Sequence, residues 1–272
     1  MRSHAAKSAV AIATGALVVA LVPSTGAGAA SYSLDRRIND SQVHESSGLT
    51  YSTYKRPTLW THNDSGDGPR IFAISRKGVT RSVLQIENAS ANDWEDIASG
   101  PRHTLWIGDI GDNGRRRGQI TVYRIKEPKN LERSSVRATR FDLEYPDGAH
   151  DAEGMMVHPR TGRVFVISKA KGNAGIYRAP KVLRAGKVNQ LKRVGSAPDI
   201  VTAAGFSPNG KRFVLGTYTA AYVYKRLGGK GRRVETPKTN QGESLTVSRS
   251  SRAILIGSEG HDSPVYRVAM PR

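Results

Sequence analysis

Short hydrophobic runs recur along the chain at a nearly constant interval. Within each copy an aromatic residue follows an apolar or small one in a tetrad, and the tetrads span residues 71–74, 122–125, 176–179, 223–226 and 265–268. The aromatic residues of successive tetrads are 51, 54, 47 and 42 positions apart. Repeats of roughly 40–50 residues are typical of the blades of β-propellers. The pattern therefore predicts five copies of one structural unit.

Two more hydrophobic runs precede each tetrad. The nearer run is rich in β-branched, aromatic and aliphatic residues, at positions 59–62, 105–107, 164–167, 213–215 and 254–256. The farther run places a small or polar residue before a hydrophobic one, at positions 48–49, 96–97, 154–155, 205–206 and 244–245. We call the three predicted strands a, b and c in chain order, with the tetrad as c. Since the runs are short and no convincing amphipathic helix is present, the sequence predicts an all-β fold, a β-propeller.

The two ends of the repeat region indicate how such a ring closes. Five units of this length fill residues 31–272, predicted to be a single domain, so we expect five blades, with six as the alternative. The fifth copy ends soon after its tetrad and lacks a fourth strand. Residues 32–38 alternate in polarity and are predicted to complete the last blade, which would cover an exposed edge. An open solenoid or a sandwich is the structural alternative.

The first thirty residues have the pattern of a secretory signal peptide. Arg2 and Lys7 precede an apolar stretch at residues 9–22, and small residues follow up to position 30. The stretch is shorter than the roughly 20 apolar residues that span a bilayer. We therefore expect cleavage near residue 30 and a secreted, extracellular protein without a stable membrane anchor. A retained N-terminal anchor is the alternative.

The composition of the chain excludes several kinds of chemical site. The chain has 272 residues, of which 38% are hydrophobic and 24% charged, and it has no cysteine. Disulfide scaffolds, thiolate metal sites and cysteine nucleophiles are therefore excluded. The net charge is +19, or +17 without Arg2 and Lys7, so anionic polymers are attracted to the protein although no nucleic-acid-binding motif is present. We expect a monomer whose partner is a small molecule or an anionic polymer.

Carboxylates gather at one predicted end of the ring. In a propeller, strand a runs along the central channel, so we compared the residue before the strand-a pair, and the residue two positions earlier, in all five copies. These positions are Ser47, Glu95, Glu153, Ala204 and Glu243, and Glu45, Asp93, Asp151, Thr202 and Gln241. Residues two apart lie on the same side of an extended chain. The six acidic residues, predicted to be metal ligands, are Glu45, Asp93, Glu95, Asp151, Glu153 and Glu243.

Six carboxylates at one channel mouth require a counter-charge, because like charges at short range raise one another's pKa. Calcium is the cation we expect, since it takes six to eight oxygen ligands, and another divalent metal is the second choice. The alternative is a network of protein side chains, in which Arg115 or Lys169 neutralises the acids.

Other polar residues are predicted at the same end and are candidates for ligand binding: His62, Asp64, Asp109, His150, Lys169 and His261. Residues 64–67 look superficially like a calcium loop but lack the acidic residue at the twelfth position of an EF-hand. No Gly-x-Ser-x-Gly or His-Glu-x-x-His motif occurs. The sequence assigns no catalytic nucleophile.

Several segments resemble a group of secreted actinobacterial WD-repeat-like propellers, and this resemblance covers most of residues 40–270. They are the segments at residues 45–49, 59–66, 93–98, 108–113 and 150–153. The acidic channel positions are also distantly similar to esterase-like phytase and gluconolactonase propellers. The second resemblance implies that the channel carboxylates hold a divalent metal.

Two functions are compatible with these patterns. The sequence favours an exported propeller that binds a ligand or an anionic surface polymer through an acidic, cation-occupied channel mouth. The alternative is a metal-dependent hydrolase of a lactone or a phosphoester, with Glu95, Glu153 and Glu243 as metal ligands. In that case His62 or His150 is the candidate general base.

Overall fold

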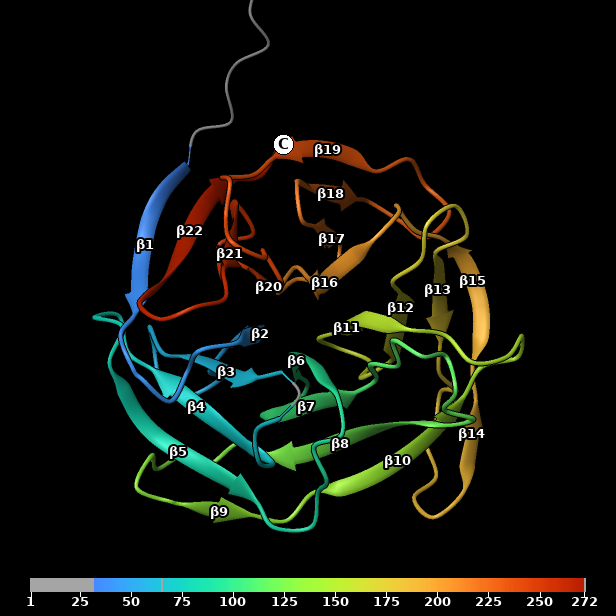
Figure 1. Cartoon of the computed structure of the whole chain (residues 1–272), viewed down its shortest axis with the longest axis horizontal. Helices are drawn as coiled ribbons and strands as arrows, with labels where there is room; N and C mark the ends of the chain where they lie inside the picture. Colours follow the sequence, from blue (N-terminus) through green and yellow to red (C-terminus); the bar gives the residue numbers. More distant parts are fainter. Residues whose placement is uncertain (1–31, 65, 272) are drawn as a thin grey trace, which may run out of the picture.

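Five β-sheets surround a central channel in the computed structural model, which describes residues 32–64 and 66–271 (Figure 1). Those residues contain no helix, and therefore none that is long and apolar enough to cross a membrane. The all-β, five-blade propeller predicted from the repeats is confirmed. The predicted signal peptide, residues 1–30, lies outside the described residues.

The strands of each blade are given from the channel outward. Blade 1 contains β2 (Ser46–Tyr51), β3 (Leu59–Asn63), β4 (Arg70–Ile74) and β5 (Thr80–Ile86). Blade 2 contains β6 (Trp94–Gly100), β7 (Thr104–Asp109), β8 (Ile120–Lys126) and β10 (Thr139–Glu144). Blade 3 contains β11 (Ala152–Val157), β12 (Val164–Ser168), β13 (Gly175–Arg178) and β15 (Lys192–Ser196). Blade 4 contains β16 (Val201–Phe206), β17 (Phe213–Thr217), β18 (Ala220–Tyr224) and β19 (Arg232–Glu235). Blade 5 contains β20 (Ser244–Val247), β21 (Ala253–Gly257), β22 (Ser263–Ala269) and β1 (Tyr32–Ile38).

The ring is closed by the N-terminal strand, as the sequence predicts. Strand β1 pairs antiparallel with β22, from Tyr32 opposite Val268 to Ile38 opposite Ser263. The last blade therefore combines three strands from the end of the described chain with one from its beginning (Figure 1). This pairing covers the edge that β22 would otherwise expose.

The innermost strands β2, β6, β11, β16 and β20 pack against one another around the channel. Small residues make this close approach possible. A Cβ atom on Gly48 in β2 would lie 2.6 Å from the backbone nitrogen of Ile97 in β6 and 2.4 Å from Nε2 of His62. The small residue that begins the predicted strand a therefore has a steric role between blades.

The sequence alignment of the fourth copy is wrong by two residues. In four blades the aromatic residue of the tetrad pairs with the third residue of the hydrophobic run of strand b: Phe72 with Thr61, Tyr123 with Ile107, Tyr177 with Val166 and Tyr266 with Ile256. In blade 4 the equivalent pair is Leu215 with Tyr222, not a pair containing Tyr224. The connection from β17 to β18 is only residues 218–219, and a shift of two residues preserves the alternation of faces, so the pattern alone did not fix the register.

Two short strands extend blades 1 and 2 and were not predicted. β9 (Ser135–Val136) pairs parallel with β5, and β14 (Val188–Gln190) pairs parallel with β10. Each comes from the connection between strands c and d of the following blade and lies along the outer edge of its neighbour (Figure 1). Strands of two or three residues are too short to produce a recognisable period.

A buried charge cluster ties the closing strand to the rest of the ring. Asp35 lies at a bulge in β1, and its side chain is fully buried. Its carboxylate accepts hydrogen bonds from Arg36 at 3.0 Å and Arg76 at 2.7 Å, and forms an ion pair with Arg267 of β22 at 3.1 Å. Burial acts to raise the pKa of Asp35, but the three guanidinium groups outweigh it and hold the pKa below its ordinary value of 3.8.

We expect Asp35→Asn to lower the free energy of unfolding by about 3 kcal/mol at pH 7, because it leaves the buried guanidinium of Arg36 without its counter-ion. The folded state favours the ionised carboxyl, so this stabilisation is present above pH 3.8 and is lost as the pH falls through the lower folded-state pKa. The gap between the two proteins should therefore narrow in acid. Urea denaturation at pH 7 and pH 3 measures both effects.

The matched control is Asp262→Asn, which removes an exposed ion pair with Arg37 at 3.6 Å. Exposed pairs contribute about 0–1 kcal/mol, so this variant should unfold nearly as the parent does. Equal losses in the two variants would contradict a special role for Asp35.

Candidate metal centre

The second residue of the inner strand lies outside the regular strand pairing in four of the five blades. In blades 1 to 4 a register shift between strands a and b leaves one residue unpaired: Ser47, Glu95, Glu153 and Thr202. Thr202 thus takes the place that the sequence alignment gave to Ala204. Such bulges redirect a side chain out of the regular alternation of the strand. Glu243 directly precedes β20 in blade 5, and Glu95, Glu153 and Glu243 are all buried.

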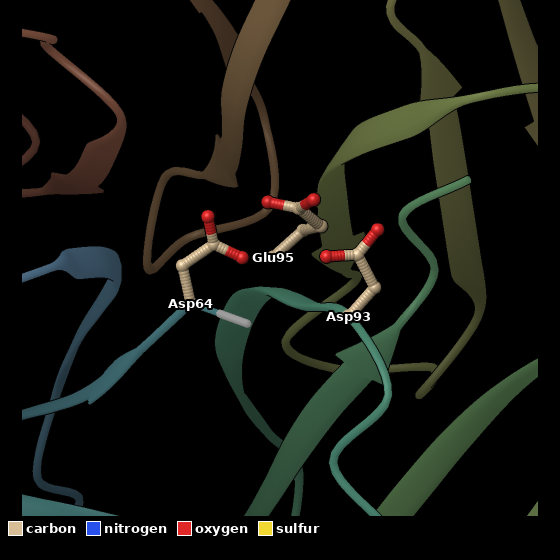
Figure 2. A group of neighbouring side chains, drawn as sticks. All are labelled: Asp64, Asp93 and Glu95. Carbon is tan, nitrogen blue, oxygen red and sulfur yellow. The ribbon is translucent and has the colours of Figure 1, made fainter. Parts of the chain in front are cut away.

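Five carboxylates form two groups that share one member. Asp64, Asp93 and Glu95 make one group, and Asp64, Glu243 and Glu259 make the other. In each group the potential ligand atoms lie within 4.8 Å of one another. Figure 2 shows the first group, in which Asp64 follows β3 and faces two side chains from the start of β6. The ring brings blades 1, 2 and 5 together at this point.

The electrostatics of these groups favour a bound cation. Among the described ion pairs, none involves Asp93, Glu95, Glu243 or Glu259. Burial, followed by the charge of Asp64, raises the pKa of Asp93 to about 6. Burial and Glu243 raise the pKa of Glu259 to about 9. Burial and the neighbouring carboxylates also raise the pKa of Glu95 well above its ordinary range.

The donor set fits a hard divalent cation, because every potential ligand is a carboxylate oxygen. The loop after β7 lies tightly against the first group. A Cβ atom on Gly111 would lie 2.3 Å from Oδ2 of Asp93 and 2.4 Å from Oε1 of Glu95. A larger residue at position 111 would therefore displace the carboxylates that face Asp64.

A protein-only counter-charge exists beside these groups, at Glu153. Lys169, which follows β12, forms an ion pair with this carboxylate and also donates to the hydroxyl of Tyr218 at 3.0 Å. Tyr218 in turn donates to Glu243 at 2.9 Å. Burial raises the pKa of Glu153 to about 8 although Lys169 acts to lower it, and Oε2 of Glu153 is buried without a hydrogen-bond partner. The structure therefore contains residues suited to both ways of neutralising the acids that the sequence analysis considered, a bound cation and an ion pair with a basic side chain.

The remaining predicted acidic residues make other contacts. Asp151 accepts a hydrogen bond from the backbone N–H of Asp112 at 3.0 Å. Asp109 is fully buried and pairs with Arg117 at 2.8 Å. Glu45 is 44% exposed and lies 3.5 Å from the ring of His44. These three carboxylates belong to neither of the two groups around Asp64.

The histidines lie in different surroundings. His62 is fully buried, its Nδ1 lies 2.8 Å from the carbonyl oxygen of Asn63, and burial lowers its pKa to about 4. The imidazole of His62 is therefore neutral at pH 7 and shielded from a substrate. His150 lies 2.9 Å from both Asp147 and the hydroxyl of Tyr177. His261 is exposed, with its ring 6.2 Å from that of His44.

Comparison with solved structures shows a related fold. A gluconolactonase from Xanthomonas campestris, described as important in glucose secondary metabolic pathways, superposes with a TM-score of 0.51 and 15% sequence identity. The match covers 86% of this chain and 89% of the other. At this identity the likeness is one of fold. Neither the protein-family models nor the curated proteins give a match, so the resemblance to WD-repeat-like proteins stays a prediction.

Two acidic residues were not among the predicted site residues. Glu259 follows β21, and its place beside Glu243 follows from the pairing of β20 with β21, in which Ser244 lies opposite Gly257. Asp96 stands in β6 where blades 1 and 3 have glycine, and it is fully buried. The acidic residue at a position otherwise occupied by small residues was a signal available in the sequence.

Asp96 joins three blades. Its carboxylate accepts hydrogen bonds from the backbone N–H groups of Ile97 at 2.8 Å, Met155 at 2.9 Å and Ala204 at 3.1 Å. These donors belong to β6, β11 and β16. Burial raises the pKa of Asp96 well above its ordinary range, although the three N–H groups oppose the rise. The arrangement indicates a structural role within the channel.

Calcium should stabilise the protein through Asp64, which belongs to both carboxylate groups. At a free concentration of about 100 Kd, a ligand that binds only the folded state adds about 2.7 kcal/mol. We expect a chelator to lower the melting temperature, calcium to restore it, and Asp64→Asn to remove most of this response. Asp67→Asn is the control, because Asp67 lies in the same loop but pairs with Arg70 and belongs to neither group. A parent protein indifferent to divalent ions would reject the metal centre.

For Asp96, we expect Asp96→Ala to cost at least about 3 kcal/mol, because it leaves three backbone N–H groups of the channel without their acceptor. Asp96→Asn should lose less, since an amide oxygen can still accept. Calorimetry with and without calcium should show the same loss in both conditions. A loss that depends on calcium would instead make Asp96 part of the metal centre.

Proposed function

We propose that this chain is a divalent-cation-dependent hydrolase that opens a lactone ring at the acidic mouth of the channel. The observation that carries the proposal is the pair of carboxylate groups sharing Asp64, whose other four members have no ion-pair partner among the described residues. The fold likeness to a gluconolactonase supports the choice of a lactone as substrate.

Calcium is the cation that we propose, held by Asp64, Asp93 and Glu95, with Glu243 and Glu259 forming a second carboxylate group that also includes Asp64. A divalent ion in such a site supplies a Lewis acid for the ester carbonyl and lowers the pKa of water.

The reaction also requires proton transfer, in which side chains of the site take part. In lactone hydrolysis the oxygen of water bonds to the ring carbonyl carbon, the bond from that carbon to the ring oxygen breaks, and the ring oxygen takes up a proton to give a hydroxy acid. We assign Asp93 as the acceptor of the water proton, because it is only half-buried whereas Glu95 beside it is 3% exposed. Lys169 and Tyr218 are the donors next to the carboxylates, and we assign them to orient polar groups of the substrate.

Binding without turnover is the second candidate, and it is the function that the sequence alone favoured. The contacts of Lys169 with Glu153 and with Tyr218 support it, because they neutralise part of the mouth without a metal ion. We also propose that the protein is exported, which rests on the pattern of residues 1–30.

Assays on a panel of γ- and δ-lactones should detect calcium-dependent hydrolysis by the parent protein. Asp64→Asn and Glu95→Gln should each lower kcat/KM by about 10- to 100-fold or more, the scale expected when a metal site loses a ligand or its orientation. Asp67→Asn should retain activity, since Asp67 lies outside both groups.

Two other outcomes have distinct meanings. Turnover of phosphoesters but of no lactone would keep the hydrolase and overturn its substrate class. Calcium binding without turnover of either class would overturn the hydrolase in favour of a binding protein.

A further inference from the structure

A second feature lies on the face of the ring opposite the carboxylates. A groove of about 690 Å³ runs between blades 2 and 3 and has five basic side chains in its lining, with no acidic one: Arg102, Arg124, Lys126, Arg137 and Lys181. We call this the basic groove. Residues 101–103 connect the end of β6 to the start of β7, whereas the carboxylates lie at the start of β6, so the two sites are at opposite ends of the blades.

The charges in the basic groove have no counter-ion among the residues that the structure describes. None of its five basic residues takes part in an ion pair within the described part of the chain. Arg102, Lys126, Arg137 and Lys181 are exposed. Such a set of cations creates a local positive potential that favours an anionic partner.

One guanidinium of the groove is held in place by aromatic rings. Arg124 lies over Trp106 at 5.5 Å and over Phe141 at 5.2 Å, both measured to the ring centroid. These contacts restrict its side chain and leave its N–H groups available, because it donates no side-chain hydrogen bond to another described residue. A pre-oriented arginine loses less conformational entropy when it binds an oxyanion.

The chemistry of the lining favours phosphate groups. Arginine binds phosphate oxygens through two parallel N–H donors, and two threonines, Thr139 and Thr161, add hydroxyl groups to the same lining. The apolar side chains of Val182 and Leu183 offer a surface for the carbon backbone of a polymer. Trp106 is only 4% exposed and lies beneath Arg124, so it offers no free face on which a nucleic-acid base could stack.

From these observations we infer that the basic groove binds a linear phosphodiester polymer with a polyol backbone. Several separate cations along one groove suit a chain of repeated phosphates better than a single small anion. This site is independent of the proposed hydrolase, because it lies on the other face and shares no residue with the carboxylate groups. A polymer bound there would hold the protein while leaving the channel mouth accessible.

The test compares two triple variants with the same loss of charge. The groove variant is Arg102→Gln, Arg137→Gln and Lys181→Gln, and the control variant is Lys77→Gln, Lys211→Gln and Lys230→Gln, whose residues are exposed and lie outside the groove. The probe is synthetic poly(glycerol phosphate), with binding measured by calorimetry or fluorescence anisotropy between 50 and 200 mM salt. Melting curves of all proteins verify that they are folded.

We expect the groove variant to lose at least about 10-fold in affinity, and the slope of log K against log salt to fall by about 2, since each phosphate contact on a flexible chain contributes about 0.7. The control variant should show less than half of this loss of affinity and of this change in slope. Equal losses in the two variants would overturn the proposal, because they would reflect the net charge of the whole protein.

The chemical class is tested by competition. Heparin, which carries sulfate groups, and a single-stranded oligonucleotide of equal charge should both bind more weakly than poly(glycerol phosphate). Tighter binding of either polymer would overturn the assignment. A second variant, Arg124→Gln, should weaken binding of the probe with little change in melting temperature.

Discussion

Closure of the ring by β1 and β22 is the contact on which the rest of this structure depends. Each blade packs its inner strand against the two neighbouring blades, and in a ring that fails to close β2 and β20 would lose each other as neighbours. The closing pair is secured by the Asp35 cluster, where one buried carboxylate meets three arginines from β1, β22 and the turn after β4. A buried charge of this kind stabilises only while all partners are in place, so it makes closure specific.

Closure has an electrostatic consequence at the channel. Because the inner strands converge, acidic residues that are far apart in the sequence meet at one mouth. Asp64 from blade 1 lies close to carboxylates of blade 2 (Figure 2) and to carboxylates of blade 5. The chain neutralises Asp109 with Arg117 and Glu153 with Lys169. Among the described residues, no basic side chain forms such an ion pair with Glu95 or Glu243. The two carboxylate groups that share Asp64 are therefore the ones that could bind a cation.

The two ends of the blades are chemically opposite. Strand starts and the loops between strands b and c supply carboxylates, whereas the turns between strands a and b, together with the segments after strand c, line the basic groove of blades 2 and 3. A protein of this design can hold a cation on one face and an anionic chain on the other without competition between them. Five of the 42 lysines and arginines line the basic groove, so it adds a defined positive surface to the attraction that any basic protein exerts on polyanions.

The sequence by itself determined the fold class, the number of blades and the strand that closes the ring, because these follow from a local period of two and from a repeat that is visible along the chain. It also indicated that Asp93, Glu95 and Glu243 belong to one end of the channel. Asp64 was predicted at that end as well. Only the tertiary structure decided that Asp64 belongs to both carboxylate groups, that Glu259 joins one of them, that Lys169 pairs with Glu153, and that His62 is buried. It also decided the register of blade 4, since a shift of two residues leaves the pattern of faces unchanged. The contacts of Asp64 with Glu243 and Glu259 join segments that lie far apart in the sequence, and their distances are set only when blades 1 and 5 meet in the closed ring.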